Sequence, residues 1–479
     1  MNNKKYYLNL VIGLAFMFLF RYVPAPAPMT ALGMQVVGIF IGTIYLIATT
    51  HPAFPAFIAI TLLITTPLFN FKEALANSFG HWVPTFVLSI LLLSYALVKC
   101  GVAKRITIWF MTRKAAQKSP WAFMALFFGS IFVLGFFVDV FALMAFYLAA
   151  IDLICTELGY EKKSRFATAL VLGVAFLIVT MGASTGFQPH VAIVLGLYSN
   201  ITGNTIGMFE YTAWSFIPLV LIFITYLLMA KFIIKPDFSK FKNFDPTTLS
   251  SQVGDITKQE IYTGIIYLLV VVGWFLPGLA KMLGIESAII KTIGSYSLVW
   301  PAFVGIILLS IIRVEGKPLM DLKVAAKEGV PWHIVFLVIG NMILARALTS
   351  PETGFTDWFT QVLGPLTNGA STFTLFLFGA VFTAILTNLG SNSVAGIVAF
   401  QLVALLIKDP QVLMLVALPV AFSTRLATML PSSFVGIGMT YGNEWVDSKK
   451  ILPYGFIFVV SAIAILMLVG YPLANIIFG

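Results

Sequence analysis

The segment LTNLGSNSVAG, residues 386–396, places Asn and Ser side chains in the middle of an apolar stretch that runs from 371 to 408. A second apolar stretch, residues 121–157, also has its polar residue at the middle, Asp139 in GFFVDVFALM. A helix needs about 20 residues to cross the ~30 Å hydrocarbon core of a bilayer. Each stretch is therefore too long for one crossing and long enough for two short arms. We predict two re-entrant hairpins with polar tips inside a membrane.

The composition of the whole chain is that of a membrane protein. Of its 479 residues, 59% are hydrophobic and 10% are charged, whereas about a quarter of the residues in a soluble domain are charged. The first apolar run follows Lys4 and Lys5 without a small-residue cleavage pattern, so we predict a retained span rather than a signal peptide. The expected fold is an all-α polytopic membrane protein with about eleven spans, near residues 7–25, 35–49, 53–70, 82–98, 166–199, 213–234, 260–281, 290–312, 332–349, 410–441 and 452–478.

The basic residues orient these spans. Twenty-two Lys and Arg residues fall on one side of the predicted topology and five on the other. Because Lys and Arg concentrate in cytoplasmic loops, we predict a cytoplasmic N-terminus in a plasma-membrane protein. The net charge of +10 thus reflects topology and indicates no nucleic-acid partner. Cys100 and Cys155 lie near predicted cytoplasmic ends and predict neither a disulfide nor a metal site.

The segments around the two hairpins repeat. A span led by Trp82 or Trp332 precedes each hairpin. A span interrupted by Gly, Pro and small polar residues follows each, MGASTGFQPHVAI from Met181 and RLATMLPSSFVGI from Arg425. The first block starts outside and the second inside, so we predict inverted repeats. Five regions result: scaffold helices 1–119, the first hairpin and broken helix 120–235, a cytoplasmic linker 236–258, scaffold helices 259–370, and the second hairpin and broken helix 371–479.

Broken helices at membrane depth have a chemical use. Unpaired backbone groups are tolerated there only where protein or a water-filled cavity satisfies them. Helix N-termini exposed by a break attract anions, and free carbonyls can bind sodium. Paired interrupted segments in two halves of a chain are typical of a transporter binding site. The four His residues are scattered and no nucleophile–base pair stands out, so we predict a transporter rather than an enzyme.

At GSNSVAG and at the Pro-containing breaks, the chain resembles the divalent anion:sodium symporter family, which carries Ser-Asn-Thr motifs at two hairpin tips. The resemblance extends over nearly the whole chain. It implies a homodimer in the lipid bilayer, with a fixed scaffold and a mobile transport domain, and a small di- or tricarboxylate substrate. The first tip departs from the motif, since Phe137, Val138, Asp139 and Val140 stand there.

The resemblance also implies which residues bind substrate. Those carried over are Ser391, Asn392 and Ser393 at the second tip, Thr428, Pro431, Ser432 and Ser433 at the second break, and Ser184, Thr185, Gln188, Pro189 and His190 at the first break. Sodium is the only cofactor considered, with possible ligands Asn388, Ser391, Asn392 and Asp139.

Three ionisable residues lie within the predicted membrane segments near the site. Asp139 is the acidic one, and buried carboxylates are paired, protonated or functional. It is expected to be a proton-coupling group, a counter-ion to His190 or Arg425, or a sodium ligand, and the alternative is a structural buried pair. His190, at the first break, is expected to hold a substrate carboxylate. Arg425 precedes the second break and is expected to support the site, as is Asn388.

We therefore predict a secondary transporter of organic anions, C4 or C5 dicarboxylates such as malate, succinate or 2-oxoglutarate, with an elevator mechanism. Dicarboxylate exchange, sodium symport and proton coupling remain open. The alternative is a sodium/proton antiporter of the same superfamily that uses Asp139 and carries no organic substrate. His190 and Arg425, as cationic or donor groups near the breaks, favour an anion.

Overall fold

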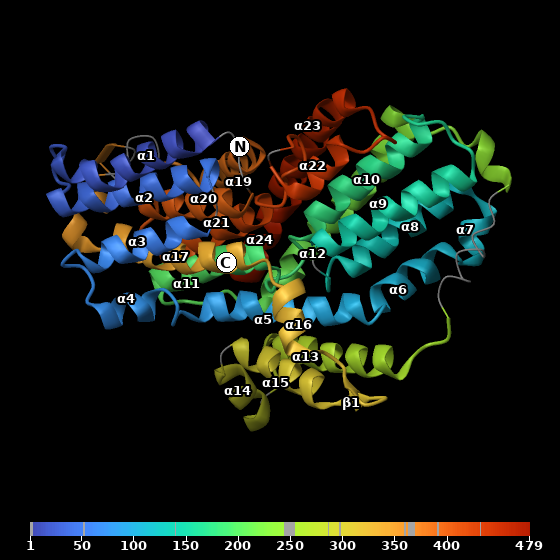
Figure 1. Cartoon of the computed structure of the whole chain (residues 1–479), viewed down its shortest axis with the longest axis horizontal. Coiled ribbons are helices and arrows are strands. Elements are labelled where there is room, and N and C mark those ends of the chain that lie inside the picture. The colour runs from blue at the N-terminus through green and yellow to red at the C-terminus, as the bar shows by residue number, and fades with distance from the viewer. Residues whose placement is uncertain are drawn as a thin grey trace.

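The computed structural model describes most of the chain. It covers residues 3–50, 53–138, 140–243, 254–285, 287–296, 298–358, 361–362, 369–389, 392–431 and 433–479. Helices occupy every predicted span and both arms of each predicted hairpin. Figure 1 shows most of them running along the long axis of the molecule.

The chain starts with a group of helices at the left of Figure 1. These helices are α1 (Asn3–Leu19), η1 (Phe20–Tyr22), α2 (Ala31–Thr49), α3 (Phe54–Ile64), α4 (Phe71–Asn77) and α5 (Trp82–Lys99). α1 packs on α2, and α2 and α3 pack on α17 (Trp332–Leu348) from the second half of the chain. Close approach requires small residues here, because a Cβ on Gly13 of α1 would lie 2.3 Å from Leu46 Cγ of α2.

The first predicted hairpin is a pair of helices, α8 (Pro120–Leu134) and α9 (Val140–Glu157), which both pack on α10 (Arg165–Met181). Two short helices, α6 (Val102–Met111) and α7 (Lys114–Lys118), connect α5 to it. Figure 1 places α8, α9 and α10 together at the right of the molecule.

The middle of the chain continues from α10 into the second half. Its elements are α11 (Pro189–Thr202), α12 (Met208–Met229), the π-helical turn η2 (Ala230–Ile234), η3 (Ser239–Asn243), α13 (Lys258–Met282), α14 (Ala288–Ser295), α15 (Val299–Ile311), α16 (Leu322–Glu328) and η5 (Pro351–Thr353). The two-residue strands β1 (Arg313–Val314) and β2 (Lys317–Pro318) pair antiparallel. This hairpin corrects the all-helical prediction. Glu315 and Gly316 both have positive φ, 52° and 80°, which a tight two-residue turn requires.

The second predicted hairpin consists of α19 (Thr372–Leu389) and α20 (Asn392–Leu406), which pack on each other and on α21 (Pro410–Ser423). The chain ends with α22 (Val435–Tyr441), α23 (Ser448–Ile465), the π-helical turn η6 (Leu466–Gly470) and α24 (Tyr471–Phe478). α20 and α21 also pack on α11, so the second hairpin contacts the first broken helix.

Helix length alone identifies fewer spans than the hydropathy pattern. Among the described residues, five helices are long and apolar enough to cross a membrane, or six if α16 and α17, bent by 79° at their junction, count as one. The predicted spans at 166–199 and 410–441 each consist of two shorter helices, one after the other, because the chain breaks within them.

Candidate transport site

Both long predicted spans are interrupted where the sequence places Gly and Pro. Residues 182–188 separate α10 from α11, and residues 424–434 separate α21 from α22. Pro189 is the first residue of α11, where its missing N–H costs no helical hydrogen bond. The same missing N–H prevents an α-helix from continuing unbroken through Pro189. The predicted breaks are therefore present in the structure.

Two side chains of α12 bond backbone carbonyls of the first break. The Tyr211 hydroxyl donates to the carbonyl of Ala183 at 3.1 Å, and Ser215 Oγ donates to that of Ser184 at 2.6 Å. Ser184 Oγ and Gln188 Nε2 in turn donate to the Gly135 carbonyl at 3.1 and 2.8 Å. Ser184 and Gln188, predicted to bind substrate, thus hold the end of α8 in this structure.

Asn388 at the end of α19 holds the second break. Its Nδ2 donates to the carbonyls of Ala384 and Leu426 at 2.8 and 2.7 Å. Its Oδ1 accepts from the backbone N–H groups of Thr428 and Met429 at 3.0 and 2.8 Å. The two accepted bonds occupy both lone pairs of Oδ1, so this arrangement favours the supporting role of Asn388 over sodium ligation.

Ser433 also holds backbone of the second break. Its Oγ donates to the carbonyls of Leu430 and Ala427, at 2.5 and 3.3 Å. Its own carbonyl accepts from the N–H of Asn392, at 3.1 Å. The tip of the second hairpin is thereby attached to the second break.

Arg425 connects the two breaks. Its Nη1 lies 3.1 Å from Nδ1 of His190, and a guanidinium has only donors. Because of this, the arginine donates and Nδ1 of His190 accepts this bond. The predicted contact of His190 with a substrate carboxylate, as a cation or as a donor, stays a prediction. The guanidinium also packs against Gly182, and its Cζ lies 5.7 Å from the centre of the Phe434 ring.

Asn392, the first residue of α20, completes this group. Its side chain lies near His190. The first break, the second break and the second hairpin tip therefore meet around Arg425, His190 and Asn392. All three residues are buried, at 2%, 6% and 4% exposure.

Several buried polar atoms near these breaks have no hydrogen-bond partner within the described residues. They are Thr180 Oγ1, Thr185 Oγ1, Asn392 Nδ2, Ser423 Oγ and Thr428 Oγ1. Leaving a buried polar group unpaired costs about 1–3 kcal/mol, and most native proteins avoid it. These atoms are candidates for contact with a polar ligand.

Of the remaining predicted site residues, some lie outside the part of the chain that the structure describes. Asp139, Ser391 and Ser432 lie outside the described residues. The backbone of Ser393 belongs to α20, but its side chain is also outside the description. Pro189 is buried, whereas Pro431 is exposed.

Sequence reasoning missed part of the site. Thr180 and Ser423 were not predicted, nor was the packing of Gly182 against Arg425. One signal was available. Thr180 and Thr185 are five residues apart in the first broken span, and Ser423 and Thr428 are five residues apart in the second. Aligning the two spans on their hydroxyl residues would have found this spacing.

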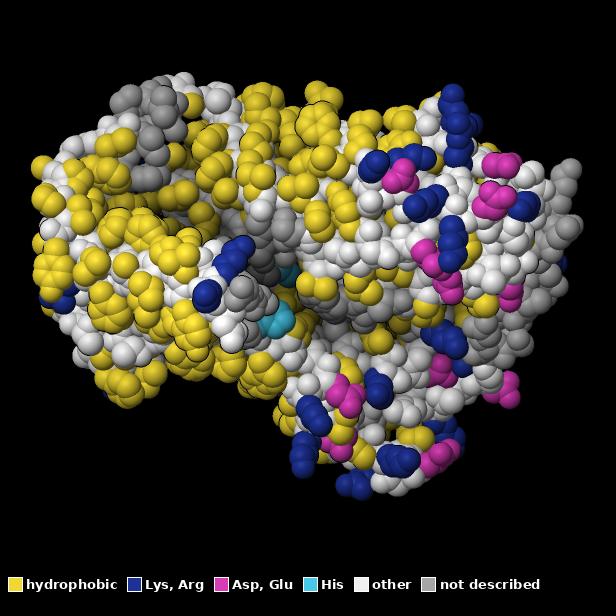
Figure 2. Space-filling view, turned by 45° about the horizontal axis from the view of Figure 1, so that its top comes forward, with side chains coloured by type: hydrophobic (Ala, Val, Ile, Leu, Met, Phe, Trp, Pro, Cys, Tyr) yellow, Lys and Arg dark blue, Asp and Glu magenta, His cyan; other side chains and the backbone are white. Residues whose placement is uncertain are grey.

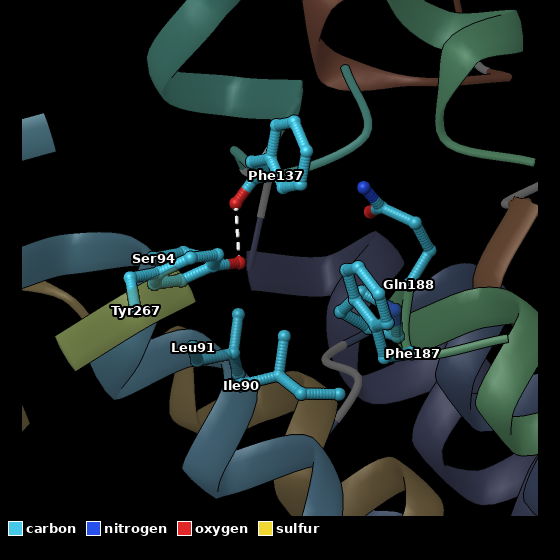
Figure 3. A pocket seen from close by; sticks show the side chains of 8 residues that line it. Ile90, Leu91, Ser94, Phe137, Phe187, Gln188 and Tyr267 are labelled. Carbon is cyan, nitrogen blue, oxygen red and sulfur yellow. Dashed lines mark hydrogen bonds between the residues drawn. The ribbon is translucent and has the colours of Figure 1, made fainter. Parts of the chain in front are cut away.

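A small pocket lies where the first break meets α5 and α13. It is lined by Ile90, Leu91, Ser94, Phe137, Phe187, Gln188, Pro189 and Tyr267. Figure 3 shows the Tyr267 hydroxyl directed at the Phe137 carbonyl, with a donor–acceptor distance of 2.6 Å. Phe187 stacks on Trp274 of α13, with ring centres 4.8 Å apart. The contact is thus mostly apolar.

Two broken helices joined by buried polar groups inside an apolar helical fold define the class of secondary membrane transporters. Comparison with models of known protein families identifies the transporter family to which the chain belongs. The model of the sodium:sulfate symporter transmembrane region matches residues 4–478, so the chain belongs to the sodium:sulfate symporter family. Membership implies sodium-coupled anion transport and a transporter rather than an enzyme.

A solved structure shares the fold. The YdaH transporter of Alcanivorax borkumensis, whose topology is described as unusual, superposes with a TM-score of 0.54 at 14% identity. The match covers 98% of this chain and 97% of that one. No curated protein matches the chain.

Proposed function

We propose that this protein is a secondary transporter of C4 or C5 dicarboxylates, with its substrate site where the two breaks and the second hairpin tip meet. One observation carries the proposal. Buried donors without partners in the described residues, Thr185 Oγ1, Thr428 Oγ1 and Asn392 Nδ2, belong to the same breaks and tip that Arg425 and His190 join. A ligand rich in acceptor oxygens would satisfy them.

Two helix N-termini strengthen the preference for an anion. α11 begins at Pro189 and α20 begins at Asn392, and these two helices pack on each other. Each helix N-terminus carries a partial positive charge and attracts anions. With the guanidinium of Arg425, these ends provide positive potential for a divalent substrate. A sodium/proton antiporter binds only cations, and positive potential at the site disfavours cation binding.

The proposed movement is of elevator type, as a rigid displacement of residues 120–235 and 371–479 against 1–119 and 259–370. The contact between Phe187 and Trp274 supports it, because apolar surfaces can slide without leaving hydrogen bonds unpaired. Tyr267 and Phe137 form a hydrogen bond that such a movement would break. The proposal includes a homodimer formed through the scaffold, as the family resemblance implies.

Uptake into proteoliposomes tests the function. Radiolabelled succinate, malate, 2-oxoglutarate and sulfate would each be presented with a sodium gradient, with a pH gradient, and with internal dicarboxylate. We expect dicarboxylate uptake that requires sodium. Uptake that requires internal dicarboxylate, and no sodium gradient, would show that the mechanism is exchange rather than symport. Transport of sulfate alone would overturn the dicarboxylate proposal, since the family name includes that anion. Sodium-dependent proton movement without anion uptake would establish the antiporter.

A pair of substitutions tests the site. In Thr185→Val the hydroxyl without a described partner is removed, so the unliganded protein should be no less stable. Substrate affinity should fall by about 10-fold, as expected for a lost hydrogen bond to a charged group. Thr43→Val is the matched control, because Thr43 is equally buried but bonds the Ile39 carbonyl within α2. Equal affinities for the two variants would exclude Thr185 from the site.

A further inference from the structure

A second polar cavity lies far from the breaks. It has a volume of about 480 Å³ and is formed by the start of α10, the turn η2 and the start of α23. Its lining residues are Arg165, Thr168, Phe232, Ile233, Ile234, Lys235, Lys450 and Tyr454. Arg165 is the first of the 17 residues of α10 and Gly182 follows the last, so this cavity and the first break are ~25 Å apart along the helix.

Positive charge dominates this cavity. Arg165, Lys235 and Lys450 come from three separate segments, and among the described lining residues there is no Asp or Glu. The ion pairs found in the described part of the chain involve other residues, Lys99, Arg105 and Lys162. All three residues are exposed to solvent, which screens their mutual repulsion, and an anion between them would relieve what repulsion remains. Figure 2 shows Lys and Arg gathered toward one end of the molecule.

Neutral groups in the cavity also fit an anion with oxygen acceptors. Thr168 is 2% exposed, and its Oγ1 has no hydrogen-bond partner within the described residues. The start of α10 adds the partial positive charge of a helix N-terminus. A buried hydroxyl, a guanidinium and two ammonium groups are together the donor set that binds phosphate.

The backbone that presents Lys235 is unusual. α12 ends in the π-helical turn η2, and Lys235 follows with a φ of 54°. Positive φ is uncommon for a residue with a side chain. This backbone ends the helix and places Lys235 on the wall of the cavity.

The cavity also has an apolar wall, which fits the acyl chains of a lipid. Phe232 and Ile233 are 61% and 46% exposed, at the end of a helix long and apolar enough to span the membrane. Acyl chains could lie along such residues while a headgroup lies among the cations. Basic pockets between membrane helices bind anionic lipid headgroups in this way.

We infer that the cavity between α10, η2 and α23 is a binding site for a phosphate group, carried by a membrane lipid or by a soluble phosphate compound. The site is separate from the proposed transport site. All three segments belong to the part of the chain proposed to move.

Ligand binding to the full-length protein in detergent, measured by thermophoresis, tests the inference. The probes are dihexanoyl phosphatidic acid, dihexanoyl phosphatidylcholine and inorganic phosphate. The test variant combines Arg165→Gln, Lys235→Gln and Lys450→Gln. The control combines Lys163→Gln, Lys231→Gln and Lys449→Gln, which removes the same charge from nearby exposed positions outside the cavity. Lys163 also has a positive φ, 63°, which matches Lys235. Circular dichroism would establish that both variants are folded.

We expect phosphatidic acid to bind the wild type and the control equally, and the test variant at least tenfold more weakly. Stronger binding of phosphatidic acid than of inorganic phosphate would identify a lipid as the source of the phosphate group. Equal binding of these two probes would identify a soluble phosphate compound. Absence of binding by every probe would overturn the inference. So would equal losses in the two variants, or phosphatidylcholine binding as tightly as phosphatidic acid.

Discussion

Gly182→Ala tests the link between the two breaks. Gly182 has φ −61° and ψ −5°, a backbone conformation that alanine adopts without strain. An added Cβ, however, would lie 2.1 Å from both Nε and Nη2 of Arg425 and 2.5 Å from its Cζ. Because carbon and nitrogen atoms in contact are normally ~3.5 Å or more apart, the guanidinium has to move by over ~1 Å.

Such a movement removes the hydrogen bond between Arg425 and His190, which is 3.1 Å long. A hydrogen bond to a charged group contributes about 1.5–3 kcal/mol, and 1.4 kcal/mol corresponds to tenfold in an equilibrium constant. The affinity for dicarboxylate is therefore expected to fall by roughly 10- to 100-fold, if Arg425 and His190 hold the substrate site in its binding geometry.

The assay is the initial rate of dicarboxylate uptake over a range of substrate concentrations, with thermal unfolding in detergent as a check of folding. Gly186→Ala is the matched control from the same break. Its Cβ would meet Met208 Sδ at 2.6 Å, and a flexible methionine side chain can move away. The control should keep its affinity within about threefold.

Wild-type affinity in a well-folded Gly182→Ala protein would refute the reasoning. It would mean that the position of Arg425 against Gly182 has no role in substrate binding. Equal losses in the two glycine variants would also count against it, because the cause would then be general disturbance of the break.

Three further outcomes are expected. Asn388→Ala leaves backbone groups of the second break unpaired and should lower the unfolding free energy by ~2–5 kcal/mol in detergent melts. Asn341→Ala, which loses one bond within its own helix, should lose less. Tyr267→Phe removes the bond to the Phe137 carbonyl and should change maximal uptake rate by ~2–10-fold with substrate affinity unchanged. An altered affinity at constant rate would contradict a role of this hydrogen bond in the proposed movement. Replacement of sodium by choline should abolish uptake, and undiminished uptake would exclude sodium symport.

The architecture of the chain was predictable from its sequence. Two apolar stretches of nearly forty residues, each with a polar centre, predicted the pairs α8–α9 and α19–α20. Gly and Pro within two long spans predicted the interruptions between α10 and α11 and between α21 and α22. These features are local, because membrane thickness limits helix length and Pro lacks a backbone donor.

The family was also accessible from the sequence, since the resemblance seen at GSNSVAG and the Pro-containing breaks agrees with the match over residues 4–478. The short β1–β2 hairpin was missed because its strands have only two residues each. Periodicity cannot reveal strands of that length.

The role of each polar side chain in the site required the tertiary structure. Asn388 and Ser433 were candidates for ligand contact, yet their bonds go to backbone of the second break. Arg425 could have met several partners, and the fold brings it to His190, 235 positions away in the chain.

Sequence alone thus determined a polytopic membrane transporter with two hairpins and two broken helices, because hydrophobic length and helix-breaking residues act within a few turns of chain. Tertiary structure decided which polar groups hold backbone and which remain available to a ligand. That choice depends on which distant atoms come within hydrogen-bonding distance after the helices pack, and no local pattern encodes it.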